Sequence, residues 1–120
     1  MARPLVVSIL LVLSGCAHTT LRADETFSAR DYLQTALETL AAADPDVGGH
    51  RLRAQLETKA ALEVLGEGAA SRAVPYDGPP RLEVALELLE RCEAARSVDE
   101  AALHHARQAA DELRQALASR

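Results

Sequence analysis

Apolar residues recur at intervals of three and four along much of the chain, which is the spacing of one face of an α-helix. A first helix is predicted over residues 29–43, where Ser28 followed by Asp31 fits a capping arrangement at its start. A second helix is predicted over residues 51–65, which favour a helix but show no clean apolar stripe. Residues 44–49 contain one proline and two glycines, which indicates a break between the two helices.

Two more helices are predicted in the second half of the chain. Residues 82–95 carry an apolar arc about 200° wide, so this helix should contact two neighbours. Ser97 with Glu100 fits a capping box for the last helix, whose apolar positions step by three and four as far as Leu117. The fifteen residues 66–80 include three glycines and three prolines, and they predict a loop that is long for a compact domain.

The composition agrees with an all-helical chain. Among 120 residues there are 24 Ala and 19 Leu, but one Ile, two Tyr, one Phe and no Trp. Helix formers dominate and strand formers are scarce, which excludes a sheet protein. The predicted fold class is all-α, a small antiparallel bundle of about four helices formed by residues 27–120.

The first sixteen residues have the organisation of an export signal. Arg3 gives a basic start, and a nine-residue apolar run ends at Leu13 before the small residues Ser14 and Gly15. Nine residues of helix reach about 14 Å, half of the ~30 Å hydrocarbon core, so this run cannot span a bilayer. The sequence Leu13-Ser14-Gly15-Cys16 resembles the lipobox of bacterial lipoproteins.

This resemblance implies cleavage before Cys16, a diacylglyceryl thioether on its sulfur and an acyl chain on its new amino group. Residues 1–15 would be the signal peptide and residues 16–26 a lipidated tether, with enough acyl chains for stable membrane anchoring. Ala17 stands where an Asp tends to keep Gram-negative lipoproteins at the inner membrane, so the resemblance implies the periplasmic face of the outer membrane. An ordinary secretory leader that ends by chance near a cysteine is the alternative.

The charge of the chain argues against some classes of partner. The formal net charge is −5, and loss of Arg3 with the signal peptide makes it more negative. A negative protein repels phosphate backbones and anionic headgroups, so no nucleic-acid partner is expected.

Histidine and cysteine residues are the first candidates for chemistry. Adjacent His104 and His105 point about 100° apart on a helix and so cannot share one metal ion. Glu100 with His104, at a spacing of four, is a weak candidate for a metal pair, and a solvated polar face is the alternative. Cys92 falls inside an apolar arc, which predicts a core thiol, with an intermolecular disulfide as the alternative.

The remaining motifs do not indicate an enzyme. The chain has no Gly-x-Ser-x-Gly elbow, Gly-rich phosphate loop or Cys-x-x-Cys motif, and no cofactor is expected. The acidic residues of the third predicted helix are interpreted as a solvated face, with Glu87 and Arg91 forming an ion pair. Tyr76 lies in the Pro-rich part of the long loop, where it would either contact a partner or cap the open end of the bundle.

These patterns together predict a membrane-anchored, periplasm-facing lipoprotein that binds or scaffolds an envelope protein, whose identity the sequence does not reveal. The alternative is a periplasmic helical lipoprotein that binds a ligand or metal through the His104 face.

Overall fold

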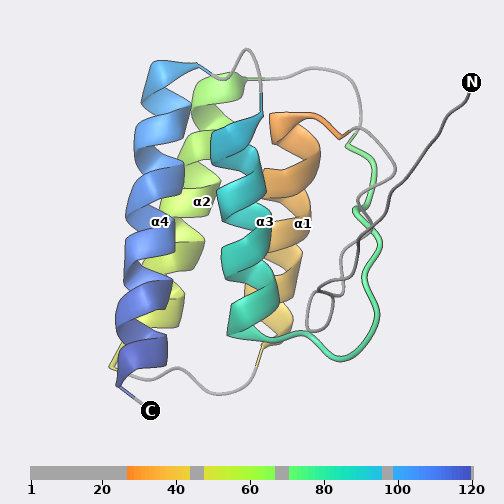
Figure 1. Ribbon diagram of the computed structural model, residues 1–120. Helices are drawn as coiled ribbons and strands as arrows, with labels where there is room; N and C mark the ends of the chain where they lie inside the picture. Colours follow the sequence, from red (N-terminus) through yellow and green to blue (C-terminus); the bar gives the residue numbers. More distant parts are fainter. Residues whose placement is uncertain (1–26, 44–47, 67–70, 96–98, 120) are drawn as a thin grey trace, which may run out of the picture.

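The computed structural model describes residues 27–43, 48–66, 71–95 and 99–119 of the chain. This part contains four helices: α1 (Ala29–Ala42), α2 (His50–Leu65), α3 (Leu82–Ala94) and α4 (Glu100–Ala118). They pack side by side, which confirms the predicted small all-α bundle (Figure 1). No helix in these ranges is both long enough and apolar enough to cross a membrane.

Each helix of the bundle has two main neighbours, and every neighbouring pair is antiparallel. Both α1 and α4 pack against α2 and against α3, so α3 has the two neighbours that its wide apolar arc predicts. In Figure 1, α1 and α4 run downward whereas α2 and α3 run upward. Helix α2 ends at one end of the bundle and α3 starts at the other. The connection between them must therefore run back along the whole length of the bundle.

The helix starts agree with the sequence in one case and differ in another. Asp31 N–H donates to Ser28 Oγ at 3.2 Å, and Ser28 N–H donates to the Asp31 carboxylate at 2.9 Å, which confirms the predicted cap of α1. The predicted box of Ser97 with Glu100 is wrong, because α4 begins at Glu100 itself. Its cap is the Asp99 carboxylate, which accepts two backbone N–H groups of the first turn at 2.8 and 3.4 Å.

An arginine in the first turn of each of α1 and α2 forms a hydrogen bond with the C-terminal end of the other helix. Arg30, near the start of α1, donates to the carbonyl of Gly66 after α2. Arg51, near the start of α2, donates to the carbonyl of Leu40 in the last turn of α1 at 2.9 Å. Each arginine thus donates to a carbonyl at the C-terminal end of the other helix, where the helix dipole is negative.

The helices bury side chains of different size. The large side chains that α1 and α3 bury completely are Leu33, Leu40, Leu88 and Leu89. In contrast, α2 buries nothing larger than a threonine, and its buried residues are Ala54, Thr58 and Ala61. The helix α4 buries five alanines besides Leu103 and Leu113, and these alanines are Ala102, Ala106, Ala109, Ala110 and Ala116. Small side chains on both helices allow α2 and α4 to approach closely.

Candidate interaction surfaces

The outward face of α2 carries the large hydrophobic side chains that are exposed in the described part of the chain. Leu52 is 52% exposed, Leu56 59% and Val64 41%. With half-buried Ala60 they stand at intervals of four residues, and we call this row the α2 strip. Successive members turn by about 40°, so the strip forms a slightly slanted line on one side of the helix.

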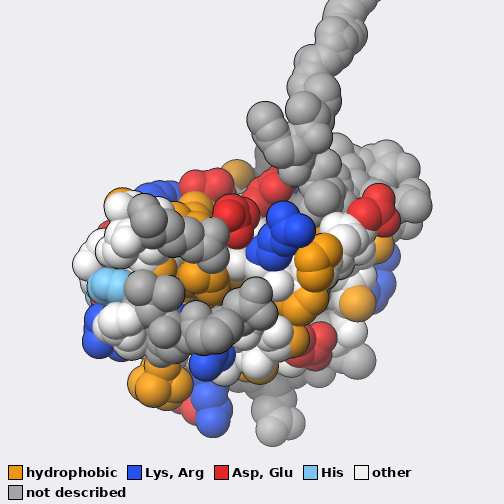
Figure 2. Space-filling model, turned by 90° about the horizontal axis from the view of Figure 1, so that it is seen from below, with side chains coloured by type: hydrophobic (Ala, Val, Ile, Leu, Met, Phe, Trp, Pro, Cys, Tyr) orange, Lys and Arg blue, Asp and Glu red, His pale blue; other side chains and the backbone are white. Residues whose placement is uncertain are grey.

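The α2 strip explains why residues 51–65 show no clean apolar stripe. The buried positions of α2 are Ala54, Thr58 and Ala61, and Leu62 and Leu65 are partly buried against the core, whereas Leu52, Leu56 and Val64 are exposed. Single exposed leucines are common, but a row at helical spacing forms a continuous apolar surface, which is typical of a contact site. Figure 2 views the end of the bundle where α2 begins, and it shows hydrophobic side chains reaching the rim beside basic and acidic ones.

Charged residues of both signs border the α2 strip. On one side, at positions 53 and 57, lie an arginine and a glutamate; on the other, at 59 and 63, a lysine and a glutamate. The border is therefore close to neutral, unlike the basic border that anionic lipid headgroups attract.

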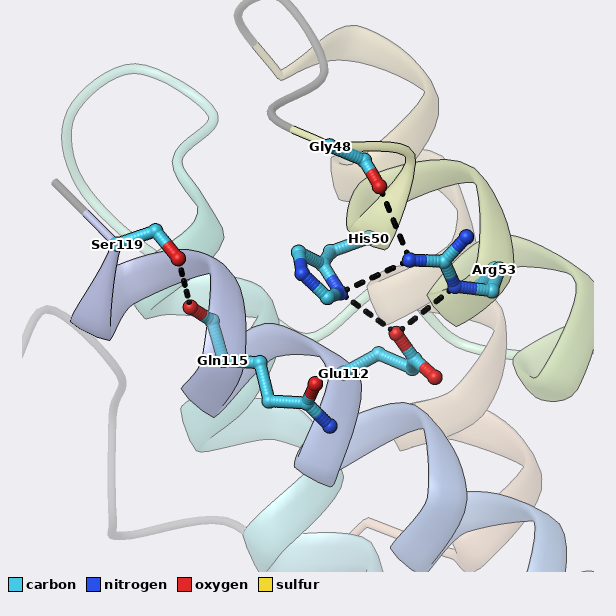
Figure 3. Close-up of polar contacts among 6 residues, drawn as sticks. All are labelled: Gly48, His50, Arg53, Glu112, Gln115 and Ser119. Atoms are coloured by element: carbon cyan, nitrogen blue, oxygen red, sulfur yellow. Dashed lines mark hydrogen bonds and ion pairs between the residues drawn. The ribbon is translucent and has the colours of Figure 1, made fainter.

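A cluster of three side chains joins α2 to α4 near the start of α2 (Figure 3). Glu112 Oε1 lies 2.8 Å from His50 Nδ1 and 3.1 Å from Arg53 Nε. Because a carboxylate only accepts, Nδ1 of His50 carries the proton in this contact. Arg53 also donates to the Gly48 carbonyl at 3.0 Å, which holds its guanidinium in place. The hydrogen bond from His50, aided by Arg53, lowers the pKa of Glu112 below its ordinary value despite partial burial.

A second pair joins the same helices two turns away. His105 Nδ1 on α4 lies 2.7 Å from Glu57 Oε1 on α2. The histidine of the first pair is on α2 and that of the second is on α4, and each helix spaces its two members by seven residues. The two pairs are therefore related by an approximate two-fold axis. Since all four side chains are partly exposed, each pair orients the helices more than it stabilises them.

On the opposite side of the bundle, the chain returns from α2 to α3 as an extended segment, residues 71–81, that lies along α1. Three polar residues of α1 at intervals of four contact alternate residues of this return segment, and the pairs are Asp31 with Arg72, Thr35 with Val74 and Thr39 with Tyr76. Four residues of helix advance about 6 Å and two extended residues about 6.6 Å, so the two spacings match.

The first two of these contacts hold the backbone of the return segment. Arg72 N–H donates to Asp31 Oδ1 at 2.8 Å, and Val74 N–H donates to Thr35 Oγ1 at 3.0 Å. Burial opposes ionisation of Asp31, but the backbone N–H groups of Ser28 and Arg72 outweigh it and lower the pKa of the carboxyl group. The Arg72 guanidinium also lies 4.5 Å from the ring centre of Phe27, a cation–π contact.

Tyr76 lies in this return segment, half-buried against the core, with its hydroxyl 3.4 Å from Thr39 Oγ1. Its contact with Thr39 places it beside the last turn of α1, and the next residue, Asp77, is exposed. Nothing in the described residues tests whether a partner contacts Tyr76, so that contact stays a prediction.

The candidate metal pair and the cysteine lie in different surroundings. Glu100 and His104 are both exposed on α4, and the His104 ring stacks edge-on against His105. Within the ranges the structure describes, no three His, Cys, Asp or Glu side chains are placed to hold a metal ion. Cys92 is completely buried, which confirms the predicted core thiol, and burial raises its pKa to about 12.

Two other sequence predictions have clear outcomes. The ion pair between Glu87 and Arg91 is confirmed, with a nitrogen–oxygen distance of 2.9 Å. The lipobox residues Leu13, Ser14, Gly15 and Cys16 lie outside the described residues, so lipidation stays a prediction.

Comparison with known proteins does not extend these observations. No family model matches the chain, and no curated protein or solved structure shows significant similarity to it.

Sequence reasoning missed the α2 strip and the two His–Glu pairs. The pairs did leave a signal, because His50 and Glu57 repeat the spacing of His105 and Glu112 with the residue types in the same order. The α2 strip left a weaker signal in the sequence. Leu52, Leu56 and Val64 recur at multiples of four within a segment that shows no clean apolar stripe.

Proposed function

We propose that the protein is a membrane-anchored, periplasm-facing lipoprotein that binds or scaffolds an envelope protein at the outer membrane. The anchor rests on the sequence Leu13-Ser14-Gly15-Cys16 at the end of an apolar run too short to span a bilayer. The binding role rests on one structural observation, the return segment that holds half-buried Tyr76 beside exposed Asp77.

An ordered aromatic ring near the surface suits a contact site. The return segment presents exposed Asp77 next to half-buried Tyr76, so a partner could reach the edge of an aromatic ring that the protein itself holds in position. A ring that is already ordered loses little conformational entropy on binding, which favours its use as a contact. The envelope partner is assigned to this segment, and the α2 strip is considered separately below.

Labelling with radioactive palmitate tests the anchor. Cys16→Ser should abolish incorporation of the label and block cleavage after Gly15, because the thiol that receives the lipid is gone. The matched control is Cys92→Ser, which removes the other cysteine and should leave labelling unchanged. Label on the Cys16→Ser protein would contradict the lipobox interpretation.

Photocrosslinking in intact cells tests the binding role. A photoreactive side chain at exposed position 77 should capture an envelope protein of constant mass, whereas the same group at exposed Gln108 on α4 should not. Tyr76→Ala should reduce this capture, and Tyr76→Phe should retain it, because the aromatic ring supplies most of the contact area. Equal capture from positions 77 and 108 would contradict a contact at the return segment.

A titration with zinc or copper separates this function from the metal-binding alternative. The proposed function predicts that either metal leaves the thermal midpoint of the mature protein unchanged. A metal-dependent rise that His104→Ala abolishes would favour the alternative instead.

A further inference from the structure

We propose that the α2 strip is the contact between two copies of this chain, related by a two-fold axis that runs along the strip. The observation behind this proposal is the distribution of side chains on α2, where Leu52, Leu56 and Val64 are exposed in one row while the fully buried positions hold only alanine and threonine. The argument about the membrane below rests on the proposed lipid anchor, whereas the arguments from shape and charge do not.

The shape of the α2 strip suits a helix–helix contact. Residues at intervals of four form the ridges that interlock in the commonest class of helix packing, in which the two axes cross at about −50°. Half-buried Ala60 stands between Leu56 and Val64, and a small residue inside the row lets a second helix approach closely. With the two-fold axis along the strip, each member of the row lies next to the same residue of the other copy.

The charges that border the α2 strip select this orientation. Glu57 and Lys59 lie about 80° to either side of the strip and differ in height by about 3 Å. A two-fold axis along the strip brings opposite borders together, so Glu57 faces Lys59 of the second copy, and the pair occurs twice. The reversed orientation would bring equal borders together, with Glu57 against Glu57 and Lys59 against Lys59, which is unfavourable.

Glu57 is free to take part in this contact. Its Oε1 accepts from His105, which leaves Oε2 for a second donor, and the side chain is 35% exposed. Lys59 is exposed on the other border. The same His–Glu pair that joins α2 to α4 therefore also orients a carboxylate toward the second copy.

The proposed anchor favours the same orientation. A two-fold axis nearly parallel to α2 places Phe27 of both copies toward the same end of the dimer, so both chains lead toward one membrane. Cys16 and Phe27 are eleven residues apart and can be separated by at most about 40 Å. A contact of four small or medium-sized side chains per copy is weak in dilute solution, but confinement to one membrane raises the effective concentration of the second copy.

Disulfide crosslinking of the full chain in cells tests the proposal. Leu56→Cys should form a covalent dimer under mild oxidation, because residue 56 lies next to its own counterpart. Gln108→Cys, a matched exposed position on α4, and the unchanged chain, whose Cys92 is buried, should both remain monomeric. Coexpressed Leu56→Cys and Ala60→Cys chains should crosslink with each other less than Leu56→Cys crosslinks with itself.

Three results would overturn the proposal. A Leu56→Cys chain that dimerises no more than Gln108→Cys would exclude the α2 strip as the contact. A Leu56→Cys adduct with another envelope protein would assign the strip to that protein. Crosslinking mainly between positions 56 and 60 would exclude the stated orientation. Palmitate labelling of the same samples reports the anchor separately, so failure of the anchor and failure of the dimer contact are distinguishable.

Sedimentation of the purified full chain in detergent gives a second measurement. Leu56→Glu should weaken self-association about tenfold or more, because it places a charge in the centre of an apolar contact. Its thermal midpoint should stay at the value of the unchanged chain, because Leu56 is exposed in the monomer. An unchanged association constant would overturn the proposal.

Discussion

The two sides of the bundle bury apolar surface in different ways. The side formed by α1 and α3 is filled by leucines and covered by the extended return segment. On the side formed by α2 and α4 most of the fully buried residues are alanines, with Thr58 and Leu113, and His–Glu pairs join the two helices at the rim. The comparison shows that a helix can be held mainly by close approach of small residues, which leaves some of its larger aliphatic side chains, such as Leu52 and Leu56, available for contacts outside the bundle.

The largest expected effect distinguishes buried leucines from exposed ones. Leu89→Ala on α3 should lower the free energy of unfolding by about 2–5 kcal/mol, because it opens a cavity in a completely buried position. Leu56→Ala on α2 is the control and should change it by less than about 0.5 kcal/mol. Urea denaturation measures both, and equal losses would contradict the stated difference between the two sides.

The second prediction tests the close packing of α2 against α4. Ala106→Leu should lower the free energy of unfolding by about 1–3 kcal/mol, since a larger side chain must separate two helices that meet through small residues. Ala101→Leu places the same side chain at an exposed position of α4 and should be nearly neutral. Equal melting temperatures of the two variants would contradict close packing of α2 against α4 at Ala106.

A third prediction concerns the return segment on the α1 side. Thr35→Val removes the oxygen that accepts the buried Val74 N–H and should lower the free energy of unfolding by about 1–3 kcal/mol. Thr35→Ser keeps the oxygen and should cost less. Thermal denaturation checks the order, and a Thr35→Ser variant less stable than Thr35→Val would show that the methyl group, not the hydrogen bond, matters.

The smallest expected effects are pH-dependent and compare one carboxylate from each side. The pKa values of Asp31 and Glu112 are lower in the folded protein than their ordinary values. Each group therefore stabilises the fold above its unfolded pKa of about 4, and this contribution is lost as the pH falls through the folded pKa. Asp31→Asn and Glu112→Gln should each reduce stability at pH 7, and the effect should shrink as the pH falls below about 4.

The difference between these two variants sharpens the comparison. Asp31 is buried and holds two backbone N–H groups, whereas Glu112 is partly exposed and bonds to side chains that solvent also reaches. Asp31→Asn should therefore have the larger effect at pH 7, and the Glu112→Gln effect should stay below about 1 kcal/mol. Urea denaturation between pH 7 and pH 3 measures both, and a larger effect of Glu112→Gln would reverse the assignment.

The sequence predicted the local structure well where short-range patterns determine it. The expected helices at 29–43 and 51–65 match α1 and α2 to within one residue at each end. The Ser28 cap is correct because it depends on four consecutive residues. The Ser97 cap is wrong because Asp99 offers an equally good oxygen two residues later, and sequence alone does not rank the two.

The candidate surfaces could not be predicted because they depend on which helices become neighbours. His50 and Glu112 are 62 residues apart, and their contact requires α2 to pack antiparallel to α4. The polar row at Asp31, Thr35 and Thr39 is visible in the sequence, but nothing local indicates that a distant extended segment will supply its partners. Residues 51–65 show no clean apolar stripe, so only the burial of Ala54, Thr58 and Ala61 reveals which face of α2 points inward.

The return segment also determines which helices become neighbours in the bundle. Its extended length carries the chain from the end of α2 to the far end of the molecule, so α3 starts diagonally opposite α2 and parallel to it (Figure 1). A chain with a tight turn in place of residues 67–81 would have to fold α3 back beside α2, as in a simple up-and-down bundle. The same four helices would then acquire different neighbours. Either α2 would no longer pack against α4, or the leucines that it now exposes would be buried. The connection between α2 and α3 thus determines which face of α2 is exposed to other molecules.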